Sequence, residues 1–164
     1  MFLKTVFNLM DRAVNWCLAL LMAAMVAVVS AQVWCRFVLN DPLAWSEEAG
    51  RYLFVWISFL GAAAGVRYQV HLGIDLLQKL LPDRPYRLAL VLGNLMVQIF
   101  LVVIVWGGFK ILEIVQFQES APMHISMRYP YLAVPVGAVL MLINSLRVSV
   151  GVIRNRPLDR KLQV

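Results

Sequence analysis

The charged side chains that press closest against an apolar segment lie between Trp45 and Arg51. Glu47 and Glu48 precede Arg51 by four and three residues, so on a helix either carboxylate can reach the guanidinium. One arginine cannot fully neutralise two carboxylates, and charges at a membrane boundary are costly unless they are paired or hydrated. Two interpretations therefore remain open: the cluster stabilises its own helix, or one carboxylate binds Arg36 or a partner protein.

Other residue types that could perform chemistry are few and far apart. His71 and His124 lie in different connections, whereas a metal or haem site needs several converging ligands. Cys17 and Cys35 would lie roughly 27 Å apart on one helix. A disulfide needs Cα atoms within about 7 Å, so this pair is excluded. The sequence therefore predicts no catalytic, cofactor or metal site.

The composition places these residues in a membrane protein. The chain has 164 residues, of which 62% are hydrophobic and 15% charged. A soluble domain has about 45–50% apolar residues, and a chain of this size could not bury the excess in one core. The net charge of +6 comes from Lys and Arg placed between apolar stretches. Because they form no basic stripe on a polar surface, nucleic-acid binding is not predicted.

The chain is expected to be an all-α integral membrane protein with a single membrane domain over residues 1–164. A bilayer-crossing helix needs about 20 apolar residues. Stretches of suitable length and composition predict four transmembrane helices, at about 13–35, 45–66, 88–109 and 129–147. Pro135 should tilt or kink the fourth helix. A basic cytoplasmic tail, 148–164, follows.

A shorter amphipathic segment, at about 70–81, lies between the second and third predicted spans. Its polar side includes His71, Asp75 and Lys79 at helical spacing, and leucines occupy the other side. The segment is too short to cross a bilayer. It is therefore predicted to be a helix lying in the interface plane, with its leucines in contact with membrane lipids or protein.

The distribution of basic residues predicts the orientation. Of the 15 Lys and Arg residues, 11 lie in the N-terminal segment, the second connection and the tail. The positive-inside rule therefore predicts that both termini and the interfacial helix face the cytoplasm, an N-in/C-in arrangement. The Trp45 end of the second span and the loop containing His124 should face outward.

Three function classes are compatible with this arrangement: a non-catalytic transport subunit, a self-sufficient small four-helix transporter, and a four-span membrane enzyme. A transporter usually carries ionisable residues deep in its spans, and none here lies deeper than Glu48. Asn94 and Gln98 are expected to form hydrogen bonds between helices. Gly61 and Gly65 flank three alanines, a GxxxG pattern that predicts close packing against this chain or a partner. The first class is favoured.

A family resemblance supports that choice. The stretch WSEEAGRYLFVWISFLGAAAGVRYQVHLGID, residues 45–75, resembles the small membrane subunit, DctQ-like, of tripartite ATP-independent periplasmic (TRAP) transporters. The number of spans and the predicted orientation match as well. Leu72-Gly73 departs from the family pattern, although the amphipathic helix remains. The matching residues are Arg36-Phe37, Trp45, Ser46, Glu47, Glu48, 51–54, Trp56, 59–61, Arg67 and 71–75.

The resemblance implies a role that composition alone does not. Such subunits accompany a large multi-span transport subunit and a periplasmic substrate-binding protein in the bacterial inner membrane. Uptake is driven by an ion gradient, typically sodium, and the substrates are organic acids such as dicarboxylates or sialic acids. The small subunit would be a scaffold with no cofactor and no enzymatic activity. Its expected partner interface or structural anchor comprises Arg36, Trp45, Glu47, Glu48, Arg51, Trp56, Gly61 and Gly65.

Overall fold

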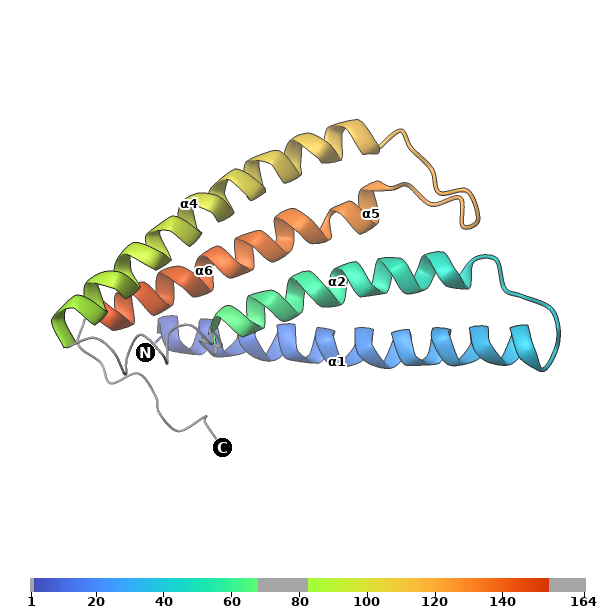
Figure 1. Ribbon diagram of the computed structural model, residues 1–164, viewed down its shortest axis with the longest axis horizontal. Helices are drawn as coiled ribbons and strands as arrows, with labels where there is room; N and C mark the ends of the chain where they lie inside the picture. The colour runs from blue at the N-terminus through green and yellow to red at the C-terminus, as the bar shows by residue number, and fades with distance from the viewer. Residues whose placement is uncertain (1, 68–82, 154–164) are drawn as a thin grey trace.

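The computed structural model describes residues 2–67 and 83–153 (Figure 1). The predicted interfacial helix at about 70–81, with His71, Asp75 and Lys79, lies outside the described residues, as does most of the tail. The described part is all-α, as predicted, and contains four long apolar helices. The helices are α1 (Phe2–Phe37), α2 (Ser46–Arg67), α4 (Asp83–Val115), α5 (Arg128–Tyr131) and α6 (Ala133–Ile153).

Two of these helices are longer than their predicted apolar spans. α1 has 36 residues, Phe2–Phe37, so the amphipathic segment before residue 13 belongs to the same helix as the predicted first span. α4 has 33 residues and extends beyond both ends of the predicted third span. Neither extension contains a helix-breaking residue in its interior, because Pro85 lies in the first turn of α4, where a missing N–H costs nothing.

The fourth span is interrupted where its sequence predicts a disturbance. α5 ends at Tyr131, and α6 begins at Ala133 after the single residue Leu132. Pro135 has no N–H to donate to the Tyr131 carbonyl, and its ring crowds that carbonyl. The interruption therefore divides the span into a short first turn, α5, and a long helix, α6.

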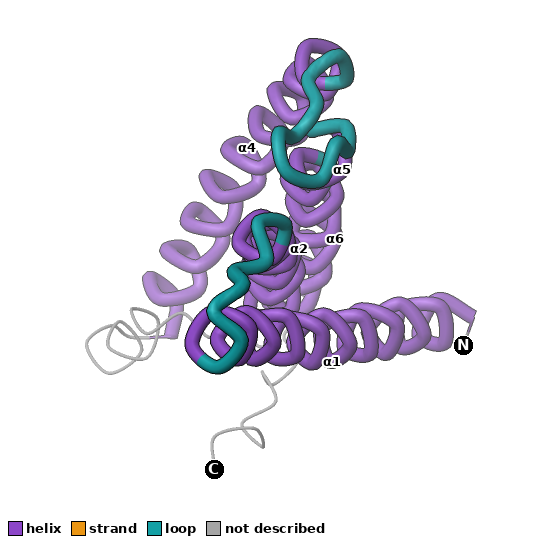
Figure 2. The backbone as a smooth tube through the Cα atoms, turned by 90° about the vertical axis from the view of Figure 1, so that its right-hand side faces the viewer, coloured by secondary structure: helices purple, strands orange, loops and turns teal. Residues whose placement is uncertain are grey.

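The helices form an open row in the order α1, α2, α6, α4. α1 packs against α2, α2 against α6, and α6 against α4, whereas no backbone contact joins α1 to α4 or α6. Figure 1 shows α2 and α6 in the middle of the row, and Figure 2 shows α1 steeply inclined to α4 and α6. The core consequently lies around α2, α6 and the inner face of α4. Its buried apolar residues are Leu60, Ala63, Leu101, Leu112, Val115, Ala133 and Ala138.

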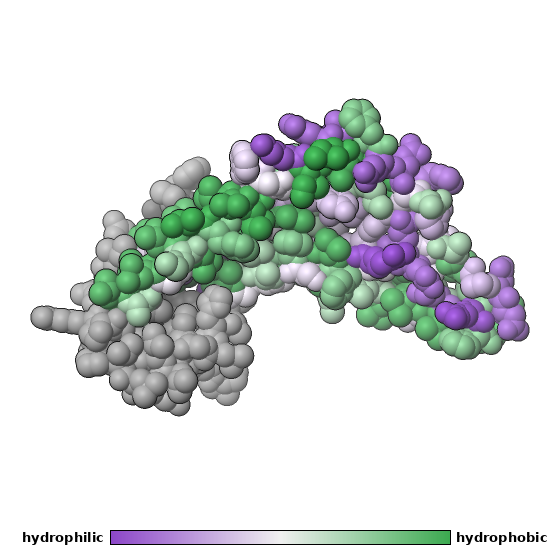
Figure 3. Space-filling view, turned by 45° about the horizontal axis from the view of Figure 1, so that its top comes forward, coloured by the Kyte–Doolittle hydropathy of each residue, from purple (hydrophilic) through white to green (hydrophobic). Residues whose placement is uncertain are grey.

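The surface is unusually apolar for a protein in water. Most of the exposed large hydrophobic side chains belong to α1 and α4, the two outer helices of the row. Figure 3 shows the apolar band along the helices and polar residues at the end where the described loops lie. Four helical segments are long and apolar enough to cross a membrane, where lipid would cover this apolar surface. They are Thr5–Phe37, Ser46–Arg67, Val91–Val115 and Arg128–Val150.

Close helix packing occurs at glycines other than those in the GxxxG pattern. A Cβ added at Gly137 would lie 2.6 Å from the Cβ of Phe59, so α6 approaches α2 closely at this point. A Cβ at Gly61 or Gly65 would meet no atom within 4 Å in the described chain. The prediction of close packing at Gly61 and Gly65 is therefore not met within this chain. Packing of that face on a partner remains a prediction.

Candidate functional site

Two clusters, each built around a buried carboxylate, lie near opposite ends of the long helices. We call them the Glu48 cluster (Glu48, Tyr52, Ser120, Met127) and the Asp11 cluster (Asp11, Arg67, Asn144, Arg147). Both contain a buried carboxylate, with 6% of the residue exposed for Asp11 and for Glu48. A buried charge is tolerated only when partners compensate for its lost hydration, so the partners show what each cluster does.

The Glu48 cluster joins α2 to the loop between α4 and α5. The Tyr52 hydroxyl donates a hydrogen bond to Oε1 of Glu48 one turn earlier on the same helix. The Ser120 hydroxyl donates to Oε2 of Glu48 at 2.8 Å. Tyr52 Oη also lies 3.3 Å from the sulfur of Met127. Both carboxylate oxygens are thus occupied by hydroxyl groups of this chain.

The loop around Ser120 is held in shape by its own backbone. The Ser120 N–H donates to the Ile125 carbonyl at 2.9 Å, and the His124 N–H donates to the Ser120 carbonyl at 3.0 Å. The Met127 N–H closes the loop on the Gln118 carbonyl at 2.9 Å. His124 has a φ of 51°, a left-handed conformation that permits this tight return. The anchor on Glu48 therefore positions a folded loop.

The predicted ion pair between the glutamates and Arg51 is not the arrangement that forms. Both ion pairs recorded in the described chain involve Asp11. Glu48 turns inward to the hydroxyl groups, whereas Glu47 and Arg51 are exposed. Arg51 donates from Nε to the backbone carbonyl of Glu47 at 3.4 Å. Neither glutamate pairs with Arg36 in the described residues.

The remaining residues of the predicted interface lie near the same end or along α2. Arg36 is exposed, with its guanidinium 5.8 Å from the centre of the Phe37 ring. Trp45 is 43% exposed directly before α2, and Trp56 is half-buried one and a half turns past Arg51. Of the residues predicted to form the partner interface or anchor, Glu48 is therefore buried. Four others are exposed: Arg36, Trp45, Glu47 and Arg51.

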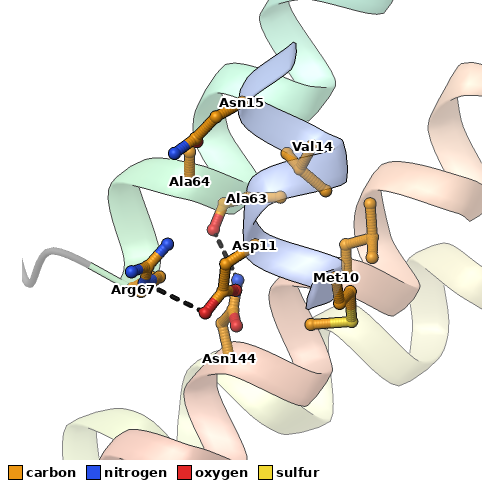
Figure 4. Close-up of a pocket in the computed structure, with 9 residues that line it drawn as sticks. Met10, Asp11, Val14, Asn15, Ala63, Ala64, Arg67 and Asn144 are labelled. Atoms are coloured by element: carbon orange, nitrogen blue, oxygen red, sulfur yellow. Dashed lines mark hydrogen bonds and ion pairs between the residues drawn. The ribbon is translucent and has the colours of Figure 1, made fainter. Parts of the chain in front are cut away.

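The Asp11 cluster connects three helices and was not predicted. Asp11 on α1 accepts two hydrogen bonds from Arg147 on α6, at 3.1 and 3.2 Å. It also lies 3.4 Å from Nε of Arg67 at the end of α2. Figure 4 shows the carboxylate of Asp11 facing Arg67 from the neighbouring helix. Local spacing could not predict this cluster, because Arg67 and Arg147 lie far from Asp11 along the chain.

Asn144 completes this cluster. Its side-chain Nδ2 donates to the Ala63 carbonyl on α2 at 2.8 Å, and its Oδ1 accepts from Arg147 at 3.0 Å. The Arg147 guanidinium also lies 4.3 Å from the centre of the Phe7 ring, a cation–π contact with α1. An amide in the span before Arg147 was the available sequence signal, since such residues commonly join membrane helices.

Gln98 forms a third polar link, between α4 and α6. Its Nε2 lies 3.0 Å from the hydroxyl of Ser149 and 3.3 Å from that of Ser145. The predicted role of Gln98 in hydrogen bonding between helices is therefore confirmed. Asn94, its predicted companion, makes no recorded side-chain hydrogen bond within the described residues.

These contacts determine what the arrangement can do chemically. The two buried carboxylates are each satisfied by groups of the same chain, and their contacts run between helices or from a helix to a loop. Within residues 2–67 and 83–153, no three His, Cys, Asp or Glu side chains come together as metal ligands. The polar interior of this protein therefore fastens helices to one another.

Comparison with known proteins agrees with this architecture. Residues 25–155 match the family described as the DctQ component of tripartite ATP-independent periplasmic transporters. The chain is 34% identical to the sialic acid TRAP transporter small permease protein SiaQ of Vibrio cholerae over 77% of its own length and 73% of that protein.

Two further relatives are much longer. The sialic acid TRAP transporter permease protein SiaT of Haemophilus influenzae is 31% identical over 78% of this chain, which spans only 21% of SiaT. The isethionate TRAP transporter permease protein DctMQ of Oleidesulfovibrio alaskensis is 23% identical over 81% of this chain and 22% of that protein. The family match covers most of the chain and defines a transport protein, which confirms the prediction that it is not an enzyme. The chain therefore belongs to the DctQ family, the small permease subunits of TRAP transporters.

Proposed function

We propose that this subunit is a rigid scaffold that supports a large transport subunit during uptake of an organic acid. The observation that carries the proposal is the placement of the polar links. Three polar side chains form hydrogen bonds that join one helix to another helix or to a loop: Glu48, Gln98 and Asp11. A subunit whose helices are joined near both ends and in the middle is suited to remain rigid while the large subunit moves.

The expected large partner is a multi-span TRAP membrane subunit. In SiaT and DctMQ, the region similar to this chain makes up about a fifth of a longer permease polypeptide. We propose that the large subunit corresponds to the remaining part of those polypeptides. A periplasmic substrate-binding protein would deliver the substrate to the complex.

The substrate class follows from the relatives. Their names specify sialic acid, C4-dicarboxylates and isethionate, all of which are organic acids. We propose an organic acid anion as the substrate and an ion gradient, typically of sodium, as the driving force. The transport chemistry would lie in the large subunit, since the carboxylates of the described chain are committed to structure or lie near helix ends.

The proposed orientation is N-in/C-in in the bacterial inner membrane. Four helix ends lie on the same side of the molecule (Figure 1): the start of α1, the end of α2, the start of α4 and the end of α6. This side includes Arg12, Arg67 and Arg147, as the positive-inside rule requires of a cytoplasmic side. The segment at about 70–81 would lie along that interface and resist movement of the scaffold.

Cysteine labelling tests the orientation. In a background with Cys17→Ser and Cys35→Ser, a cysteine replacing exposed Asp41 should react with a membrane-impermeant maleimide added from the periplasmic side. A cysteine replacing exposed Asn8 should react only after the inner membrane is opened. The reverse labelling pattern would overturn the proposed topology.

Reconstitution tests the scaffold function itself. Proteoliposomes would contain the large subunit alone, this chain alone, or both, with the binding protein supplied outside. Uptake of radiolabelled sialic acid, succinate and isethionate would be compared with an inward sodium gradient and with potassium in its place. Uptake is expected only with both subunits, binding protein and sodium. Uptake by this chain alone would falsify the scaffold proposal.

A further inference from the structure

α1 is the least buried of the long helices in the described part of the chain. Among the described helices, α1 makes backbone contacts with α2 alone, and its most apolar stretch contains no residue that the described chain buries. A helix at the edge of an open row can pivot about its connecting loop. Something other than core packing must therefore set the direction in which α1 runs.

Asp11 is placed to do so. Among residues 5–37 of α1 it alone is buried, and its two carboxylate oxygens accept parallel hydrogen bonds from Nη1 and Nη2 of Arg147. This two-point contact fixes orientation as well as distance, because the guanidinium and the carboxylate are both planar. It reaches across to α6, a helix with which the backbone of α1 makes no contact.

The surrounding groups stabilise this geometry. Arg67 from α2 lies against Oδ2 of Asp11, so the carboxylate faces cations from two helices. Asn144 holds Arg147 from its own helix at 3.0 Å, and the Phe7 ring lies 4.3 Å from the same guanidinium. These contacts hold the Arg147 guanidinium in the orientation that meets both oxygens of Asp11.

Family membership does not assign this role, since Asp11 and Phe7 precede the residues that match the family, 25–155. We propose that Asp11 is a positioning residue: its bidentate contact with Arg147 clamps the N-terminal half of α1 onto the α2–α6 pair and sets the tilt of α1. The inference depends only on contacts within the chain and stands independently of the scaffold proposal.

Distance measurements on the two native cysteines test the clamp. In the full chain in lipid nanodiscs, Cys35→Ser leaves Cys17 for one spin label, and Leu92→Cys on α4 supplies the other. A second pair, at the opposite end, combines Cys35 with Phe109→Cys after Cys17→Ser. Cys17, Leu92 and Phe109 are exposed in the structure. Pulsed electron resonance would then report the distance distribution at each end of α1.

Asp11→Asn is expected to lengthen and broaden the Cys17–Leu92 distribution while leaving the Cys35–Phe109 distribution unchanged. Arg147→Gln should cause the same change, and adding it to Asp11→Asn should cause no more. Asp11→Glu should restore much of the native distribution. Asp41→Asn, which removes an exposed carboxylate at the other end, is the matched control and should alter neither.

The clamp would be overturned if Asp11→Asn left the Cys17–Leu92 distribution as in the native chain. Equal broadening at both ends would also overturn it, because that result indicates general loosening of the fold. Should Asp11→Asn fail to give a monodisperse protein, Arg147→Lys provides the same test. It keeps the charge but loses the two-point contact, so broadening at the Cys17 end alone is again the expected result.

Discussion

Ser120 donates its hydroxyl to Oε2 of Glu48 at 2.8 Å, and this contact joins a loop residue to a helix 72 residues earlier in the chain. Ser120 is only 1% exposed, so the loop covers the carboxylate that it binds. Glu48, which the sequence groups with Glu47 and Arg51, therefore forms an internal contact that holds the loop on α2. Its neighbour Glu47 stays at the surface, which allows the two glutamates to be tested separately.

Glu48→Gln should lower the thermal unfolding midpoint of the purified protein, and Glu47→Gln should leave it nearly unchanged. Glutamine at residue 48 keeps one acceptor oxygen but presents an NH₂ group to a hydroxyl that donates. Ser120→Ala should lower the midpoint as well, because it leaves a buried carboxylate oxygen without its donor. Combining Glu48→Gln with Ser120→Ala should cost less than the sum of the separate effects. Additive losses would contradict the direct coupling.

Gly137→Ala should destabilise the packing of α6 on α2. The added methyl would lie 2.6 Å from the Cβ of Phe59, closer than carbon atoms pack. Overpacking of this kind typically costs about 1–3 kcal/mol. SDS-induced unfolding measures the loss. Gly93→Ala on α4, where an added Cβ meets nothing within 4 Å, is the control and should be neutral or stabilising.

Gln98→Leu should weaken the link between α4 and α6 without abolishing transport. It removes contacts with Ser145 and Ser149, and hydrogen bonds between membrane helices contribute about 0.6 kcal/mol on average. Asn94→Leu, four residues earlier, should have a smaller effect on unfolding. A complete loss of uptake by stable Gln98→Leu protein in proteoliposomes would show that Gln98 does more than join helices.

The proposed docking role of the exposed residues predicts a different pattern. Glu47→Gln and Arg51→Gln together should reduce co-purification with the large subunit while leaving the unfolding midpoint of the isolated chain unchanged. Both side chains are exposed, so their loss removes little from the fold itself. Asp41→Asn serves as the control. Unaltered co-purification and uptake would remove Glu47 and Arg51 from the proposed interface.

The sequence by itself determined the features that depend on local composition. Four apolar stretches of membrane-crossing length, the disturbance near Pro135 and the hydrogen-bonding use of Gln98 follow from residue types and their spacing. Helix bounds were harder to predict: α1 includes residues 2–12, because this segment contains no proline or glycine and can continue into the apolar span that follows. Local spacing also suggested pairing of Glu48 with Arg51, which are three residues apart on one helix face.

Tertiary structure decided which polar groups meet. Asp11 and Arg147 are 136 residues apart, and no local pattern distinguishes them from other charges near span ends. Glu48 accepts hydrogen bonds from the hydroxyls of Tyr52 and Ser120, and Ser120 reaches it only because the loop after α4 folds back onto α2. Close packing likewise depends on which faces oppose each other: within the described residues α6 meets α2 closely at Gly137, whereas a Cβ added at Gly61 meets no atom within 4 Å. Apolar spans can form wherever the local composition permits, but a buried charge is stable only where the whole fold brings partners to it.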